Sequence, residues 1–273
     1  MGILRPSPGA PEPSARPAAA GWPFDRQRGL IAGALVALVA LCWLHLARLA
    51  ADMAAMDPDM TMPSEGALDL VLLLAMWWIM MIGMMLPGAM PMILTFASIA
   101  RTARARGQPY VPTAIFAAGY LVAWGGFSVV ATLAQWGLEQ ASLLSPMAMR
   151  ITSPAAGGAL FVAAGLYQLT PLKRRCLSHC RSPFGFVLNR WRSGLAGALG
   201  MGLEHGLYCL GCCWVLMALL FAVGAMNLLW VIGLAAVVLV EKLFPSGVWI
   251  ARIGGLLLIA WGVALLVGSL PGP

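Results

Sequence analysis

The sequence predicts an all-α fold, a polytopic transmembrane helix bundle of about seven spans with a cytoplasmic N-terminus. Three observations support this prediction. Hydrophobic residues make up 61% of the 273 residues and charged residues only 10%, whereas soluble domains usually carry about a quarter charged residues. The apolar residues are gathered in long runs, which favour helices because isolated strands cannot satisfy their backbone in lipid. The basic residues lie mainly on one side of these runs.

The N-terminal segment 1–28 is rich in Pro, Ala, Gly and Arg and has little apolar surface to bury. We therefore expect a disordered cytoplasmic tail, followed by a transmembrane helical domain over 29–273. The first apolar run, 29–50, is long enough to cross about 30 Å of hydrocarbon. Because it lacks a clean small-residue cleavage site, we expect a retained helix and not a removed signal peptide.

Six further apolar runs are expected to be spans. They cover 68–98, 111–136, 155–171, 194–223, 228–244 and 251–270. The run 194–223 has the length for one helix or for a broken one. Small residues in 157–165 and 194–202 suit close helix packing.

The basic residues set the predicted orientation. With the N-terminus inside, every Lys and Arg except Arg48 and Arg150 falls on the cytoplasmic side, as the positive-inside rule requires. We therefore expect a multi-pass protein of the bacterial inner (cytoplasmic) membrane with a periplasmic C-terminus. The basic residues behind the net charge of +7 are explained by this membrane topology, so no nucleic-acid partner is expected.

Ionisable groups and thiols interrupt the run 194–223, in the stretch GLEHGLYCLGCCW (202–214). On a helix, His205, Cys209, Cys212 and Cys213 fall within an arc of about 100°, with Glu204 about 80° beyond its edge. Cysteines also pack as small apolar residues, but ionisable groups within spans usually face a cavity or a partner. The stripe is about 12 Å long, so one ion cannot contact both ends. It predicts either one site completed by other helices or two stations along a path.

Glu241, in VVLVEKLFP, is a candidate partner for these groups. An alternative stays open, in which its carboxylate lies at the interface and pairs with Lys242 or an arginine.

Methionines crowd the run 68–98. Met76, Met80 and Met84 form an i, i+4, i+8 ladder, with Met81 and Met85 beside it. A methionine stripe also occurs as core packing, but thioethers are soft ligands that select Cu(I) over zinc. The predicted external loop 51–63 adds four more methionines, Met53, Met56, Met60 and Met62.

Two prolines, Pro87 and Pro91, fall within the same run. They predict either a packed kink or a substrate cavity, because broken backbone in lipid is tolerated only where protein or a cavity surrounds it.

The predicted inner loop, PLKRRCLSHCRSPFGF (171–186), contains Cys176, His179 and Cys180 among basic residues. This spacing presents two or three soft donors on a single turn. A zinc finger would need a further ligand pattern, which is missing. The six cysteines do not form the pattern of a disulfide framework.

Three segments together resemble a bacterial family of integral membrane proteins. Its members are described only as predicted metal-binding proteins with a domain of unknown function. The three segments are 76–93, 167–183 and 202–230, the last with the trailing VEK of 240–242. The resemblance implies a multi-span inner-membrane protein that binds a metal. The motif residues it implies are Cys176, His179, Cys180, His205, Cys209, Cys212, Cys213, Glu241 and the methionines of 76–92. The preference for copper comes from ligand softness and not from the resemblance.

The sequence thus predicts a membrane protein that binds a soft transition metal, Cu(I) in preference to zinc, for transport or metallochaperone delivery across or within the inner membrane. The candidate ligands are Cys176, Cys180, Cys209, Cys212, Cys213, His179, His205, Glu204, Glu241, Met76, Met80, Met81, Met84 and Met85. Expected partners are the metal ion, the lipid bilayer, and a cytoplasmic or periplasmic metallochaperone or membrane complex. No nucleotide-binding loop is present, and no catalytic residue is assigned.

Two alternatives stay open. One is a structural or assembly subunit of a membrane complex. The other is a membrane thiol–disulfide oxidoreductase, which would use the Cys-x-x-Cys spacing of Cys209 and Cys212.

Overall fold

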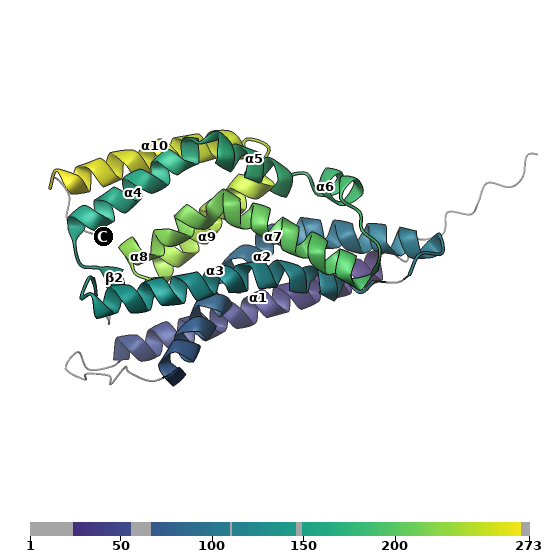
Figure 1. Ribbon diagram of the computed structural model, residues 1–273, viewed down its shortest axis with the longest axis horizontal. Coiled ribbons are helices and arrows are strands. Elements are labelled where there is room, and N and C mark those ends of the chain that lie inside the picture. The colour runs from purple at the N-terminus through teal and green to yellow at the C-terminus, as the bar shows by residue number, and fades with distance from the viewer. Residues whose placement is uncertain (1–23, 56–66, 110, 146–148, 269–273) are drawn as a thin grey trace, which may run out of the picture.

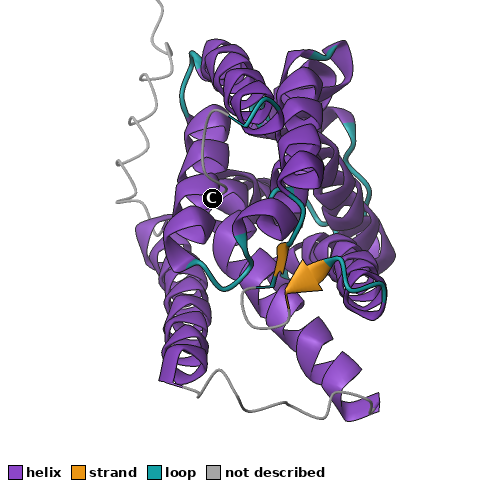
Figure 2. Cartoon of the chain, turned by 90° about the vertical axis from the view of Figure 1, so that its left-hand side faces the viewer, coloured by secondary structure: helices purple, strands orange, loops and turns teal. Residues whose placement is uncertain are grey.

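The computed structural model describes residues 24–55, 67–109, 111–145 and 149–268, and shows an elongated bundle of helices (Figure 1). The elements are α1 (Phe24–Ala55), α2 (Ala67–Ala105), α3 (Thr113–Gln140), β1 (Leu144–Ser145), β2 (Arg150–Ile151), α4 (Pro154–Leu169), α5 (Pro171–Cys180), α6 (Pro183–Asn189), α7 (Gly194–Ala218), α8 (Leu220–Val223), α9 (Leu228–Leu243) and α10 (Gly247–Leu266). The expected all-α fold is confirmed, with one short exception. β1 and β2 form an antiparallel pair that lies in front of the helices when the bundle is viewed from its end (Figure 2).

The described residues contain five helices long and apolar enough to cross a membrane, and not the seven that were expected. They are α1, α2, α3, α7 with α8, and α10. A sixth results if α4 and α5, which meet at 66°, form one bent span. The predicted orientation stays a prediction.

Prolines bound α4 and α9, the two helices that account for the difference in span number. The run 155–171 stops at Leu169 because Pro171 starts α5, whose N-cap is Thr170, and proline disfavours a helical residue before it. Helix α9 has 16 residues and ends at Leu243, close before Pro245. Both helices therefore have 16 residues, one fewer than their apolar runs.

Two other expectations concern helix boundaries. Helix α1 begins at Phe24, so residues 24–28 of the expected tail are helical, while 1–23 lie outside the described residues. Of the four loop methionines, Met53 lies in the last turn of α1, and the others lie outside the described residues. The run 194–223 is one helix up to Ala218, with only Leu219 between α7 and α8.

Helix α2 continues through its two internal prolines. The Thr95 hydroxyl donates to the Pro91 carbonyl at 2.7 Å. The prolines therefore do not divide α2 into two assigned helices.

Glycines allow the closest helix contacts, as the small-residue segments indicated. A Cβ at Gly202 of α7 would lie 1.9 Å from the Phe116 carbonyl oxygen of α3. A Cβ at Gly165 of α4 would lie 2.4 Å from the Gly255 carbonyl oxygen of α10. Backbones approach this closely only where a side chain is absent.

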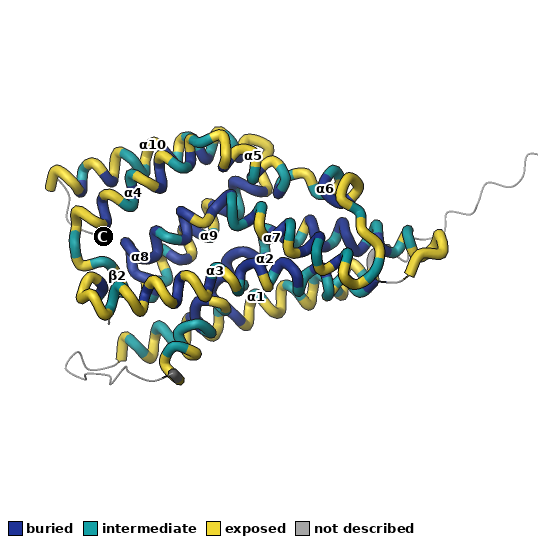
Figure 3. Tube along the Cα trace, in the orientation of Figure 1, coloured by how far each residue is buried: buried dark blue, intermediate teal, exposed yellow. Residues whose placement is uncertain are grey.

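Burial is unequal among the helices (Figure 3). In the most apolar window of each helix, 67% of the residues of α7 are buried, against 17% for α1. The stripe of polar and sulfur-containing side chains on α7 therefore faces protein and not the surroundings of the bundle.

Candidate metal centre

Helix α7 positions the centre of a buried group of sulfur atoms. His205, Cys209, Cys212 and Cys213 are all buried on it, which agrees with the arc calculated from the sequence. Their helix packs on α3 and α5 and also contacts α9. The side chains that surround this stripe therefore come from several helices.

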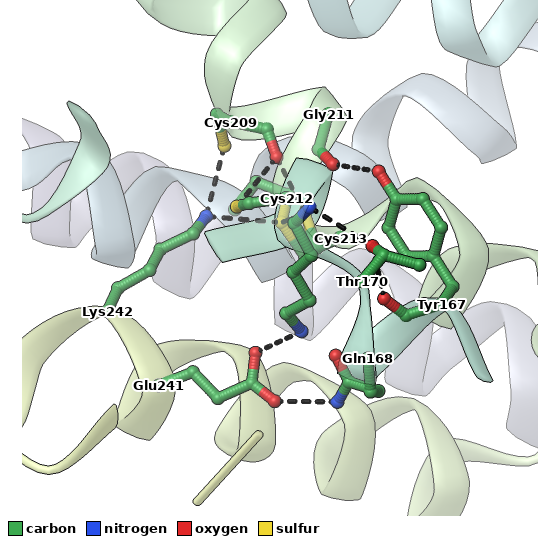
Figure 4. Close-up of polar contacts among 11 residues, drawn as sticks. Tyr167, Gln168, Thr170, Cys209, Gly211, Cys212, Cys213, Glu241 and Lys242 are labelled. Carbon is green, nitrogen blue, oxygen red and sulfur yellow. Dashed lines mark hydrogen bonds and ion pairs between the residues drawn. The ribbon is translucent and has the colours of Figure 1, made fainter. Parts of the chain in front are cut away.

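Cys209 has the largest number of polar contacts in this group (Figure 4). Its carbonyl oxygen accepts hydrogen bonds from the thiols of Cys212 and Cys213, at 3.0 Å each. Its Sγ lies 3.1 Å from the Tyr120 hydroxyl of α3 and accepts from the Lys242 ammonium of α9 at 3.0 Å. Three helices therefore meet at this one thiol.

Helix α2 contributes Met85. The Cys213 thiol lies 3.7 Å from Met85 Sδ, and the Tyr120 hydroxyl donates to the Met85 carbonyl at 3.0 Å. With metal–sulfur bonds of about 2.3 Å, as in zinc–thiolate sites, two sulfurs on one ion lie at most about 4.6 Å apart. The Cys213–Met85 separation is compatible with a shared ion.

The other candidate methionines of α2, Met76, Met80, Met81 and Met84, are buried in the same hydrophobic core. Among the described polar contacts, Met85 is the methionine of this set that reaches the thiols.

Helix α5 adds a further thiol to the group. Cys180 is buried and lies close to the thiols of Cys209 and Cys212. Cys176, one turn earlier, is half-buried and packs on α7 where Gly211 lacks a side chain, since a Cβ there would lie 2.8 Å from Cys176 Sγ. The Cys-x-x-His-Cys motif therefore directs both of its thiols toward α7.

His179 does not join them. Its Nδ1 lies 2.8 Å from the Arg175 carbonyl oxygen, and its ring stacks on Tyr208 with centroids 4.2 Å apart. The side chain is half-buried, and these local contacts hold it away from the sulfur atoms.

Glu204 also lies apart from the thiols. Its carboxylate pairs with Arg190 and, at 3.2 Å, with Arg192. This placement agrees with its position beyond the edge of the sulfur-bearing arc.

Glu241 belongs to a second buried polar group. It accepts from the Lys173 ammonium at 2.6 Å and from the Gln168 side-chain amide at 2.7 Å. The sequence left Lys242 or an arginine open as its partner, whereas the structure pairs it with Lys173 of α5. Pro171 and the Thr170 cap start α5 and so fix where Lys173 lies.

His205 lies in an aromatic environment. The centroid of its ring is 5.6 Å from those of Tyr120 and Phe186 and 6.3 Å from that of Phe116. Its Nδ1 is buried without a hydrogen-bond partner, which is unfavourable for a polar atom. The imidazole is thus positioned one turn from Cys209 with a nitrogen that protein atoms leave unpaired.

In the described part of the chain, no three His, Cys, Asp or Glu side chains form a group that could hold a metal ion. Cys212 and Cys213 direct their thiols to the Cys209 carbonyl. Binding an ion at these thiols therefore requires the loss of these hydrogen bonds.

Sequence reasoning missed four residues of the two groups, namely Tyr120, Gln168, Lys173 and Lys242. Gln168 gave a usable signal, because it is an amide at the end of an apolar run. Lys173 was hidden among the basic residues that the positive-inside rule explains.

A comparison with protein families identifies a relationship for most of the chain. The family model described as "PpoB2: Copper chaperone" matches residues 74–265, a range that includes both buried groups. Searches among curated proteins and among solved structures found no match. The chain belongs to this family, which bears out the expected relation to metal handling and is consistent with copper as the metal.

Proposed function

We propose that the chain is a membrane-embedded copper chaperone, because it belongs to the PpoB2 copper chaperone family. In this proposal, Cys209, Cys213 and Met85 hold Cu(I) as cargo. Cys180 and Cys212 lie beside these donors and take part in exchange. His205 and the remaining methionines of α2 complete the surroundings of the ion. The role is delivery, and no reaction is assigned to the chain.

The approach of Cys213 to Met85 carries this proposal. A thiol and a thioether from two different helices lie 3.7 Å apart in a fully buried position. Thiolate and thioether donors favour Cu(I), whereas calcium and magnesium need oxygen ligands. The donor set thus matches the cargo that the family description names.

The surface of the bundle supports a location in a lipid bilayer. Large apolar side chains are exposed along the long helices, such as Val122, Val130 and Leu133 on α3, and Leu256 and Leu257 on α10. Extended apolar surfaces of this kind are rare on soluble monomers and common where lipid covers them. Together with the distribution of basic residues, they favour the inner membrane with a cytoplasmic N-terminus.

Helix α5 offers a route for exchange with a partner. Cys176 is half-buried, Cys180 is buried one turn further, and Cys180 interacts with Cys209. Copper can pass along such a series because each thiol binds it before the previous one releases it. Under the predicted topology, α5 lies on the cytoplasmic side, where a cytoplasmic metallochaperone would dock.

Copper binding by the purified full-length chain in detergent tests the proposal. Cu(I) supplied anaerobically as its bicinchoninate complex should transfer to the wild-type protein. A Cys209→Ser/Cys213→Ser variant should bind less than about a tenth as much copper, because two soft donors are lost. A Cys42→Ser variant is the matched control, since Cys42 is a buried thiol on α1. Absence of copper from the wild type, or unchanged binding by the double variant, contradicts the proposal.

A further inference from the structure

Lys242 lies against the sulfur donors although it is not a candidate ligand. Its side chain is 5% exposed, and its ammonium donates to Cys209 Sγ at 3.0 Å (Figure 4). The same ammonium donates to Met85 Sδ at 3.9 Å. Gly88 of α2 leaves room for the lysine stem, since a Cβ there would lie 3.0 Å from Lys242 Cδ. The fold thus holds a cationic side chain against two of the three atoms proposed to bind copper.

No carboxylate among the described residues forms an ion pair with Lys242. The adjacent carboxylate, Glu241, is engaged by Lys173 and Gln168. Lysine is almost never fully buried unless it is paired, because a charge in an apolar interior is costly without a counter-charge. The polar contacts of this ammonium are made with sulfur instead.

Charge balance shows what the sulfur site gains from this arrangement. Cu(I) carries one positive charge, and two thiolates carry two negative charges, so a copper–dithiolate complex has one net negative charge. Met85 is a neutral thioether and leaves that charge unchanged. One ammonium at hydrogen-bond distance makes the buried assembly neutral, which removes most of the penalty for burying it.

We infer that Lys242 is the counter-cation of an anionic Cu(I)–dithiolate complex formed by Cys209 and Cys213. On loading, three copper–sulfur bonds form, to Cys209, Cys213 and the neutral thioether of Met85, as the bonds between copper and its donor break. Each of the two thiol protons passes to a ligand atom released on the donor or to the buffer. Lys242 keeps its charge and forms no bond to copper. This inference rests on the proposed function, because it concerns the same site.

Two substitutions of Lys242 test the role of its charge. Lys242→Met keeps the length of the side chain and removes the charge, and it should weaken Cu(I) binding by at least about 30-fold. Lys242→Arg keeps the charge and should stay within about threefold of the wild type. Both are measured by anaerobic competition with bicinchoninate, with the melting temperature of the metal-free protein as a check that each variant is folded. If Lys242→Met does not fold, Lys242→Gln takes its place.

A double-mutant cycle separates charge balance from a structural role. In a Cys213→Ser background only one thiolate remains, so the copper complex is already neutral. There, Lys242→Met should change the Cu(I) affinity by less than about threefold. A lysine that only supports packing would cause the same loss in both backgrounds, and this result would overturn the inference.

Two further outcomes are informative. Unchanged copper binding by Lys242→Met in the wild-type background would show that the ammonium does not affect the ion, and tighter binding would show that it competes with the ion. Either result overturns the inference but leaves the proposed function intact. Failure of the wild-type protein to bind Cu(I) would instead refute the proposed function, and the counter-cation role with it.

Discussion

Glu241 and Lys242 are neighbours on α9, yet their side chains enter two different buried environments. Glu241 meets an ammonium and an amide, from Lys173 and Gln168. Lys242, turned about 100° around the helix axis, meets the sulfur atoms of Cys209 and Met85. The first group is an ion pair, whereas the second combines a cation with soft donors and has no carboxylate from the described part of the chain.

The Lys173–Glu241 pair stabilises the fold, whereas the charge of Lys242 is available to a bound ligand. A buried ion pair is neutral by itself, so removing one member leaves an unpaired charge behind. The ammonium of Lys242 lies among thiols, and its charge is neutralised only when a complex of opposite charge forms beside it. We therefore expect the same substitution to act differently at the two buried lysines.

The largest effect is expected at the ion pair. Lys173→Met leaves the Glu241 carboxylate buried with Gln168 alone and should lower the free energy of unfolding by about 3–5 kcal/mol. Unfolding of the metal-free protein in detergent by titration with a denaturing detergent measures this change. The double variant Lys173→Met/Glu241→Leu is the control and should recover most of the loss, because no unpaired charge remains. A single variant as stable as the wild type would remove the structural distinction between the two groups.

An intermediate effect is expected when copper fills the sulfur group. At a free Cu(I) concentration about 100 times the dissociation constant, binding should stabilise the wild-type protein by about 2.7 kcal/mol. The shift of the melting temperature on addition of buffered Cu(I) measures it. Cys209→Ser should abolish most of the shift, while Glu204→Gln should retain it, since Glu204 pairs with Arg190 and Arg192. Equal shifts in both variants would place the bound copper elsewhere.

The smallest effect is expected at the second lysine in the absence of metal. Lys242→Met should change the free energy of unfolding of the metal-free protein by less than about 1 kcal/mol, or stabilise it, because an apolar side chain replaces a cation without a carboxylate partner. The same denaturation experiment gives this value beside that of Lys173→Met. A loss as large as that of Lys173→Met would make the two groups equivalent in stability.

Much of the sulfur site was predictable because it depends on one helix. The positions of His205, Cys209, Cys212 and Cys213 on a common face follow from helical periodicity, and α7 buries that face. The same arithmetic set Glu204 apart, and the structure pairs it with two arginines. Small residues likewise indicated close helix contacts, which occur at Gly202 and Gly165.

Other features were not predictable because they depend on how helices meet. Several methionines of α2 have the same helical spacing and could not be told apart by sequence. The register between α2 and α7 brings Met85 into contact with Cys213. Cys180 and His179 are adjacent in the sequence, yet α5 turns one toward the thiols and the other toward Tyr208. The seven expected spans were not confirmed, because α4 and α9 have only 16 residues each, bounded by Pro171 and Pro245.

The sequence by itself determined the helical class, the apolar character of the long helices, and the soft chemistry of the donors, because these depend on residue type and on local periodicity. The tertiary structure alone decided that Lys173 neutralises Glu241 and that Lys242 faces Cys209. Pairing between distant helices depends on their rotation and axial register. Those are set by packing over the whole interior, and no local pattern of residues encodes them.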